Sequence, residues 1–161
     1  MDRPSWDNHM LSLALLVAQK SPDEQTKCGC IISNEKHQVL SQGFNGFPRG
    51  VDDAILPKKR PLKYDWMIHA EMNAIFNCSE NPDGGVAYIT TEPCHQCLMS
   101  LWQVGIKNIV YATNTKKPHM NNETTLLNRK RLEDMSRGQL IIRGTKLDLS
   151  HLNKILKKNT N

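Results

Sequence analysis

The sequence predicts one α/β domain built in three layers, with a β-sheet between two layers of helices. A length of 161 residues suits one hydrophobic core better than two, so residues 1–161 are treated as a single domain. Predicted strands and helices alternate along most of the chain, which favours helices on both faces of a sheet. No run of about 18 apolar residues is present, so no membrane-spanning helix is expected.

The N-terminal third predicts a helix, a hairpin and a long loop. Ser5 can cap a helix that runs to about Lys20, because apolar residues at 10, 11 and 13–18 form one face. Residues 28–33 and 39–43 read as strands joined by a polar turn at 34–36. Residues 43–61 are punctuated by glycine and proline and predict a long loop, a kind of segment that is often functional.

The remaining chain alternates between the two kinds of element. The break at 81–85 is rich in Asn, Pro, Asp and Gly and separates a helix from a strand. The expected helices cover 70–78, 94–104, 123–135 and 149–157, and the expected strands cover 86–91, 108–112 and 139–143.

Composition limits the class of protein. The net charge of +5 is a weak indication of an anionic partner, and the clusters at 58–60, 129–131 and 157–158 are interpreted as solvated surface. The apolar stretch at 10–18 lacks a basic start and a cleavage site, so it is not a signal peptide and a cytoplasmic protein is expected. Five cysteines, an odd number, argue against a disulfide framework.

A candidate metal site consists of His69, Cys94 and Cys97. The C-x-x-C spacing alone fits a metal site, a redox dithiol or coincidence, but His69 stands at another predicted helix start. One imidazole and two thiolates suit Zn²⁺, and a helix N-terminus favours the thiolate form. Three ligands leave a fourth position for water, as in catalytic zinc sites. His95 is expected to point away from the ion.

Glu71 follows His69 by two residues and is expected beside the ion without binding it. A carboxylate there can take a proton from water and pass it to a ring nitrogen and a leaving amine. The pattern H-x-E followed by P-C-x-x-C is the signature of zinc deaminases.

Four stretches resemble the deoxycytidylate deaminase family over roughly residues 5–112. They are G-F-N-G-F-P-R-G at 43–50 with Asp52 and Asp53 after it, I-H-A-E-M-N-A-I at 68–75, T-T-E-P-C-H-Q-C at 90–97 and G-I-K-N-I-V-Y at 105–111. The resemblance implies a three-layer αβα cytidine-deaminase-like domain with a five-stranded mixed sheet. It also implies hydrolytic deamination of dCMP to dUMP and ammonia, which supplies dUMP for dTMP synthesis.

The resemblance also implies residue roles. Zinc-bound water would attack C4 of the base, with Glu71 as proton shuttle. Asn45 would hydrogen-bond the sugar or phosphate end of the nucleotide, since an amide offers donors and an acceptor. Lys27 would reach the 5′-phosphate, with an ordinary surface lysine as the alternative. The zinc ligands would be His69, Cys94 and Cys97, and Ala70 would contact the substrate.

Members of this family are typically homohexamers that dCTP activates and dTTP inhibits. The resemblance places Gly43, Phe44, Asn45 and Gly46 at a second nucleotide site, where Mg²⁺ would accompany the effector. The alternative is that this loop only shapes the substrate pocket. Family members often carry a tyrosine shortly after Tyr111, whereas this chain has K-K-P-H-M-N at 116–121, which leaves base contacts from 113–125 open.

Two other function classes are weighed against a dCMP deaminase. A deaminase acting on tRNA or single-stranded DNA would need a basic track and stacking aromatics, but aromatic residues make up 6% of the chain. A non-catalytic zinc module would close its metal with four ligands and would not need Glu71. Cys28 and Cys30 are interpreted as buried strand thiols, with a second metal site as the alternative.

Overall fold

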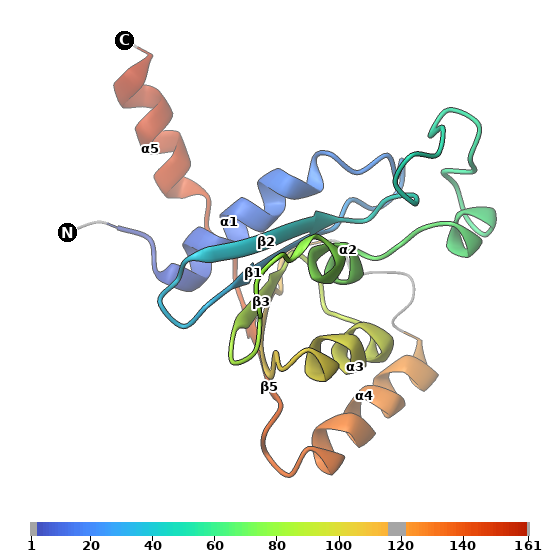
Figure 1. The fold of residues 1–161 in the computed structure, drawn as a ribbon. Helices are drawn as coiled ribbons and strands as arrows, with labels where there is room; N and C mark the ends of the chain where they lie inside the picture. Colours follow the sequence, from blue (N-terminus) through green and yellow to red (C-terminus); the bar gives the residue numbers. More distant parts are fainter. Residues whose placement is uncertain (1–2, 116–121, 161) are drawn as a thin grey trace.

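A five-stranded mixed sheet forms the centre of the protein, whose computed structural model describes residues 3–115 and 122–160 (Figure 1). The strand order is β2-β1-β3-β4-β5. β1 is antiparallel to both β2 and β3, whereas the pairs β3–β4 and β4–β5 are parallel. The strands are β1 (Gly29–Ser33), β2 (Val39–Phe44), β3 (Val86–Ile89), β4 (Asn108–Ala112) and β5 (Ile141–Thr145).

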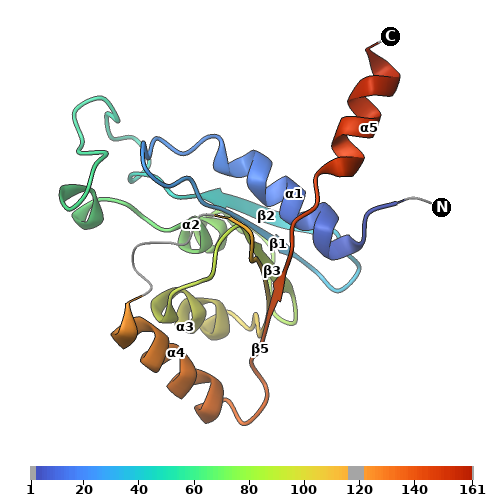
Figure 2. The ribbon, with the colours of Figure 1, turned by 180° about the vertical axis from the view of Figure 1, so that it is seen from behind.

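Helices cover both faces of the sheet, which confirms the three-layer fold predicted from the sequence (Figures 1 and 2). Helix α1 (Trp6–Ala18) packs on one face, and α2 (Ala70–Asn77) and α3 (His95–Gln103) lie on the other. Helix α4 (Glu123–Met135) packs against α3, while α5 (Ser150–Asn159) extends away from the sheet with no buried residue. Within the described ranges, every helix is too short or too polar to cross a membrane.

Successive residues of the central strands serve two separate cores because strand side chains alternate between faces. On β1, Ile31 packs with α1, while its neighbours Cys30 and Ile32 pack toward α2 and α3. β3 follows the same rule, with Tyr88 on the α1 side and Ile89 on the other. Burial on both faces explains why β3 and all of β1 except Ser33 lack polar or charged aliphatic side chains.

The predicted boundaries hold to within about two residues: the strand predicted at 86–91 ends at Ile89, and the last strand is shifted as a whole. Residues 139–143 were the predicted strand, but β5 begins two residues later, at Ile141. A turn comes first: Arg137 and Gly138 have positive φ angles of 53° and 79°. The Ser136 hydroxyl accepts a hydrogen bond from the Leu140 N–H at 3.2 Å. Pairing with β4 therefore starts only where Ile141 lies opposite Asn108.

Gly43 sets the distance between β2 and helix α2. A Cβ atom at this position would lie 2.3 Å from both the Ala70 carbonyl oxygen and the Ala74 nitrogen. Both are backbone atoms of α2, so no side-chain rotation could make room. The missing side chain therefore lets α2, with His69 and Glu71 at its start, lie directly against the sheet.

The predicted loop at 43–61 is shifted and contains structure. β2 continues through Phe44, and the connection to α2 includes a 3₁₀ helix, η1 (Leu62–Asp65). Gly46 and Ile68 close its base through two backbone hydrogen bonds of 3.0 and 2.8 Å. This connection is called the 45–68 loop below.

Candidate active site

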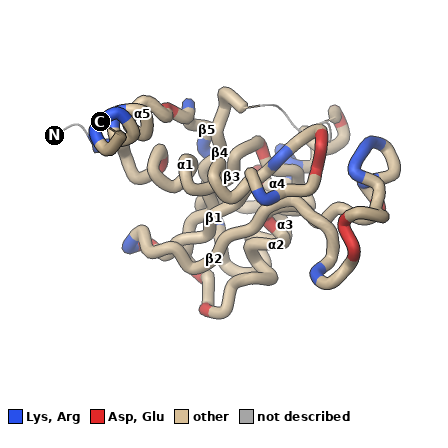
Figure 3. The backbone as a smooth tube through the Cα atoms, turned by 90° about the horizontal axis from the view of Figure 1, so that it is seen from above, with Lys and Arg blue, Asp and Glu red and all other residues tan. Residues whose placement is uncertain are grey.

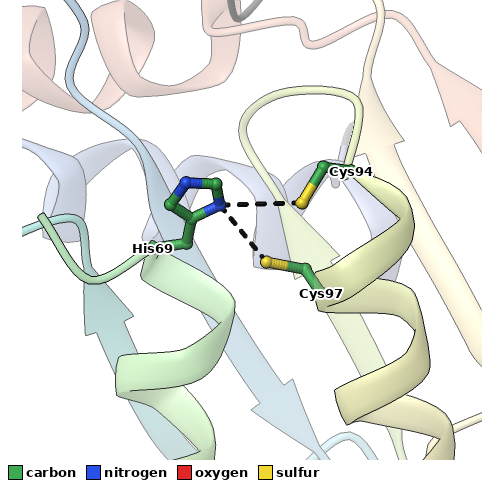
Figure 4. Close-up of side chains that lie close together, drawn as sticks. All are labelled: His69, Cys94 and Cys97. Carbon is green, nitrogen blue, oxygen red and sulfur yellow. Dashed lines mark hydrogen bonds between the residues drawn. The ribbon is translucent and has the colours of Figure 1, made fainter. Parts of the chain in front are cut away.

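Two helix N-termini bring His69, Cys94 and Cys97 together. His69 is the N-cap of α2 and Cys94 the N-cap of α3, both with extended backbone angles. The His69 Nδ1 atom lies 3.7 Å from the Cys94 sulfur and 3.4 Å from the Cys97 sulfur (Figure 4). All three donor atoms lie within 4.8 Å of one another.

These donor atoms have the spacing of a zinc site. Tetrahedral zinc with Zn–S of about 2.3 Å and Zn–N of about 2.0 Å requires nitrogen and sulfur ligands about 3.5 Å apart. The observed separations of 3.4 and 3.7 Å bracket that value. In residues 3–115 and 122–160 this is the only cluster of three or more His, Cys, Asp or Glu side chains that could hold a metal. His95 and the pair Cys28 and Cys30 do not belong to it.

Proton sharing prepares the same residues for a cation. A hydrogen bond from the Cys97 thiol, together with the neighbouring His69, lowers the pKa of Cys94 to about 4 against the effect of burial. In return, the hydrogen bond with Cys94 raises the pKa of His69 to about 9. A thiolate is thus already present, and metal binding would release the remaining protons.

Glu71 lies beside the cluster without belonging to it. Its side chain is buried, with 5% of the residue exposed, and it lines the same cavity as the three donor residues. Burial raises the pKa of this carboxyl, and the nearby Cys94 thiolate raises it too, while His69 acts in the opposite direction. A carboxyl in such surroundings can both hold and give up a proton.

The cluster opens into a cavity of about 550 Å³, a size typical of small-molecule sites. Its walls come from the segment between α1 and β1, the 45–68 loop, and the starts of α2 and α3. Polar residues of the wall include Asp23, Thr26, Asn45, Arg60, Lys63 and Glu71.

A buried carboxylate joins the two loops that form one wall. Asp23 Oδ1 accepts hydrogen bonds from the backbone N–H groups of Gln25 at 2.7 Å and Thr26 at 3.0 Å. Its Oδ2 accepts from Lys63 Nζ at 2.6 Å and from Asn45 Nδ2 at 3.2 Å. The Asp23 and Lys63 side chains are only 3% and 4% exposed. Burial would raise the pKa of Asp23, but these hydrogen bonds outweigh it and hold the pKa below its usual value.

The predicted substrate residues do not all reach the cavity. Ala70 lines it beside the cluster. Asn45 lines it too, but its amide is engaged: Oδ1 accepts from the Cys28 N–H at 2.7 Å, and Nδ2 donates to Asp23 and to the Thr26 carbonyl. Lys27 is not part of the lining, and its ammonium donates to the Ser21 carbonyl.

The predicted regulatory segment has mixed surroundings. Of Gly43, Phe44, Asn45 and Gly46, only Asn45 lines the cavity. Gly43 packs against α2, and the Phe44 carbonyl accepts a hydrogen bond from Asn73 Nδ2 at 2.8 Å. Residues 116–121, where family members often carry a tyrosine, lie outside the described residues.

Asp23, Arg60 and Lys63 were not singled out by the sequence as site residues. The interpretation of the cluster 58–60 as solvated surface was wrong for Arg60, which lines the cavity. It holds for Lys59, whose side chain is 74% exposed. The sequence signal for Arg60 and Lys63 was the presence of two basic residues at the end of the glycine- and proline-rich loop. Cys28 also lines the cavity, where burial raises the pKa of its thiol to about 12.

Comparisons with known proteins agree with this geometry. The family model described as "Cytidine and deoxycytidylate deaminase zinc-binding region" matches residues 4–113. The chain is 34% identical to the mouse deoxycytidylate deaminase over 131 residues, covering 77% of this chain and 72% of the relative. It is 32% identical to the deoxycytidylate deaminase of Mycobacterium phage D29, covering 69% and 97% respectively.

A solved structure shares the fold. The dCMP deaminase of the cyanophage S-TIM5, crystallised with dCMP and dUMP, aligns with a TM-score of 0.64. The alignment covers 90% of this chain and 100% of that chain at 21% identity.

Replacing Cys97 with serine should abolish metal binding, because a serine hydroxyl is a far weaker zinc ligand than a thiolate. The parent protein should hold about one Zn²⁺ per chain, measured by elemental analysis after dialysis. Cys78→Ser is the matched control, since the Cys78 sulfur lies outside the cluster and donates to the Glu80 carbonyl. Full zinc occupancy in Cys97→Ser would refute the ligand assignment.

Proposed function

We propose, because the chain belongs to the cytidine and deoxycytidylate deaminase family, that it hydrolyses dCMP to dUMP and ammonia. The observation that carries this proposal is the buried Glu71 carboxyl beside a His–Cys–Cys cluster at one cavity. The mouse and mycobacteriophage relatives, which match over most of their length, are named deoxycytidylate deaminases. The proposed role is supply of dUMP for dTMP synthesis, in the cytoplasm.

His69, Cys94 and Cys97 would hold the zinc ion. When bound, zinc acts as a Lewis acid that lowers the pKa of water, so that a hydroxide nucleophile is available near neutral pH. Glu71 is the group of the chain that moves protons: it takes one from the attacking water and returns protons to the ring nitrogen and the leaving amine. Its burial favours the protonated form that the second half of this transfer requires.

The rest of the cavity holds the base and excludes water. Ala70 lies between His69 and Glu71 at the first turn of α2, and it lines the wall. The N–H groups of a helix's first turn have no partner within the helix and carry partial positive charge, so they suit a carbonyl oxygen of the base. Asn45 contributes by shaping the wall near the sugar, since its amide is already hydrogen-bonded.

A nucleic-acid substrate is not favoured. In the described part of the chain, Lys and Arg positions are scattered over several elements, with Asp and Glu positions among them, and do not form one stripe (Figure 3). Strand-binding proteins combine a basic groove with a row of stacking aromatics. In the described part of the chain, the cavity lining includes two large aromatic side chains, Tyr64 and Phe76.

A substrate panel tests the proposed activity. Zinc-loaded protein should release ammonia from dCMP faster than from dCTP, from deoxycytidine or from short oligonucleotides containing cytosine or adenine. Faster reaction on an oligonucleotide would instead indicate a nucleic-acid deaminase. Absence of ammonia release from every cytosine compound would contradict the proposed function.

Glu71→Gln should leave the protein folded and metal-bound but should lower the rate of dCMP deamination. The amide keeps the shape of the carboxyl and cannot take up the proton, so the rate should fall at least about 10²-fold. Zinc content and kcat for dCMP are the two measurements. A variant with full zinc and the parent's kcat would assign the proton transfers to another group.

We also propose that the enzyme is a homo-oligomer, with a hexamer favoured, and that dCTP and dTTP regulate it with Mg²⁺. The segment from Gly43 to Gly46 supports this proposal because it touches both the cavity, through Asn45, and helix α2, through Gly43. A ligand that shifted this segment would bear directly on the helix that carries His69 and Glu71. Allosteric coupling of this kind is typically about 1–3 kcal/mol.

The saturation curve for dCMP should therefore be sigmoidal and respond to triphosphates in opposite directions. We expect dCTP to shift it to lower dCMP concentration and dTTP to shift it to higher concentration, measured at a defined Mg²⁺ concentration. Size-exclusion chromatography with light scattering gives the oligomeric state. Superimposable hyperbolic curves in all three conditions would remove the regulatory proposal and leave the chemistry intact.

A further inference from the structure

Among the described residues, the cavity lining contains one lysine and one arginine, Lys63 and Arg60, and their charges have different partners. Lys63 forms a buried ion pair with Asp23 at 2.6 Å, and Asp23 is saturated by four hydrogen bonds. The charge of Lys63 is therefore neutralised inside the wall. Arg60 lines the same cavity, and in the described part of the chain its guanidinium is not within ion-pair distance of any carboxylate.

Arg60 is held in place by two neighbours on the other loop. Its backbone N–H donates to Gln25 Oε1 at 2.9 Å, and its Nη2 donates to the Thr26 hydroxyl at 3.2 Å. Thr26 also lines the cavity. The guanidinium is thus held in position before a ligand binds. Most of its hydrogen-bonding capacity remains, since it has five N–H donors and only one of its nitrogen atoms donates to a described residue.

The guanidinium of Arg60 has hydrogen-bond donors without a partner among the described residues. Its Nε atom is buried, and within residues 3–115 and 122–160 it has no hydrogen-bond partner. Buried donors of folded proteins are almost always satisfied, by protein, water or ligand. Arg60 also lines the cavity of about 550 Å³, and among the described residues only its Nη2 atom donates a side-chain hydrogen bond, to Thr26. The remaining capacity of the guanidinium therefore suits an anionic acceptor supplied by the ligand.

We propose that Arg60, positioned by Thr26, binds the phosphate of the nucleoside monophosphate substrate. This inference rests on the proposed function and assigns the residue that selects a monophosphate over a nucleoside. A planar guanidinium suits the task, because it binds two phosphate oxygens at once and keeps its charge at every physiological pH. Lys27, the residue expected from the sequence to reach the phosphate, lies outside the lining and donates to Ser21.

With this assignment, different parts of the cavity bind different parts of the nucleotide. The base end is handled by Glu71 and the His–Cys–Cys cluster, and the wall is held by the Asp23–Lys63 pair with Asn45. Among the lysine and arginine residues of the described lining, this leaves Arg60 for a dianion. Selection against a nucleoside follows, since without a phosphate this group stays unpaired.

The test compares Arg60→Gln with Lys59→Gln. Lys59 carries the same charge on the same loop, but its exposed ammonium pairs with Glu24 and does not line the cavity. We expect kcat/KM for dCMP to fall about 10- to 100-fold in Arg60→Gln, the value of a lost charged hydrogen bond, and to stay unchanged in Lys59→Gln. Thr26→Val should give a smaller loss, and Arg60→Lys an intermediate one.

A binding measurement makes the result independent of catalysis. Titration calorimetry with zinc-loaded proteins should show that Arg60→Gln weakens dUMP binding by a similar factor and leaves deoxyuridine binding unchanged. Equal dUMP affinity in Arg60→Gln and the parent would overturn the assignment. Equal weakening of dUMP and deoxyuridine would overturn it too, because it indicates a structural role. Loss of dUMP selectivity in Lys27→Gln, with Arg60→Gln unaffected, would return the role to Lys27.

A parent protein that binds dUMP but deaminates no cytosine compound would contradict the proposed function alone. The binding comparison would still decide the role of Arg60, so the two proposals can fail separately.

Discussion

The meeting of one imidazole and two thiol sulfurs within 4.8 Å is the constraint on which the site depends. It requires the N-termini of α2 and α3 to lie side by side on one face of the sheet, so that their N-cap residues His69 and Cys94 meet (Figure 4). Gly43 allows α2 to lie this close to the sheet, because any side chain there would collide with the helix backbone. The positions of the donor atoms therefore depend on how closely α2 can approach β2.

A second constraint holds the opposite wall. Asp23 is buried with Lys63, and its four hydrogen bonds tie the segment after α1 to the end of β2 and to the 45–68 loop. Removing one partner of such a pair leaves an uncompensated buried charge, at a cost of about 3–5 kcal/mol. The network therefore makes a rigid wall from segments that have little regular structure. It also engages the amide of Asn45 and pairs the charge of Lys63 with Asp23, so both residues help to hold the shape of the wall.

The two walls divide the cavity by chemistry. Around Glu71, burial and the neighbouring Cys94 thiolate favour a proton on the carboxyl, which suits proton transfer at a heteroaromatic base. Arg60 has no carboxylate partner among the described residues, and such a guanidinium suits a phosphate dianion. A nucleoside monophosphate carries a base and a phosphate at its two ends, so it matches both environments. Charge placement within the cavity thus says more about the substrate than the net charge of +5 does.

The sequence by itself determined the features that depend on neighbours along the chain. Strand and helix positions followed from local periodicity, and the zinc residues from spacing: Cys94 and Cys97 share a helical turn, and Glu71 follows His69 by two residues. The five-stranded fold came through the family resemblance carried by the same motifs. Only the tertiary structure showed that Asp23, Asn45, Lys63 and Arg60 line one cavity. Four of their hydrogen bonds join residues 19 to 40 positions apart, across a loop whose closure no local pattern encodes. A charged residue in a loop looks the same in sequence whether it faces solvent, as Lys59 does, or is turned inward, as Arg60 is, because burial is a property of what folds over it.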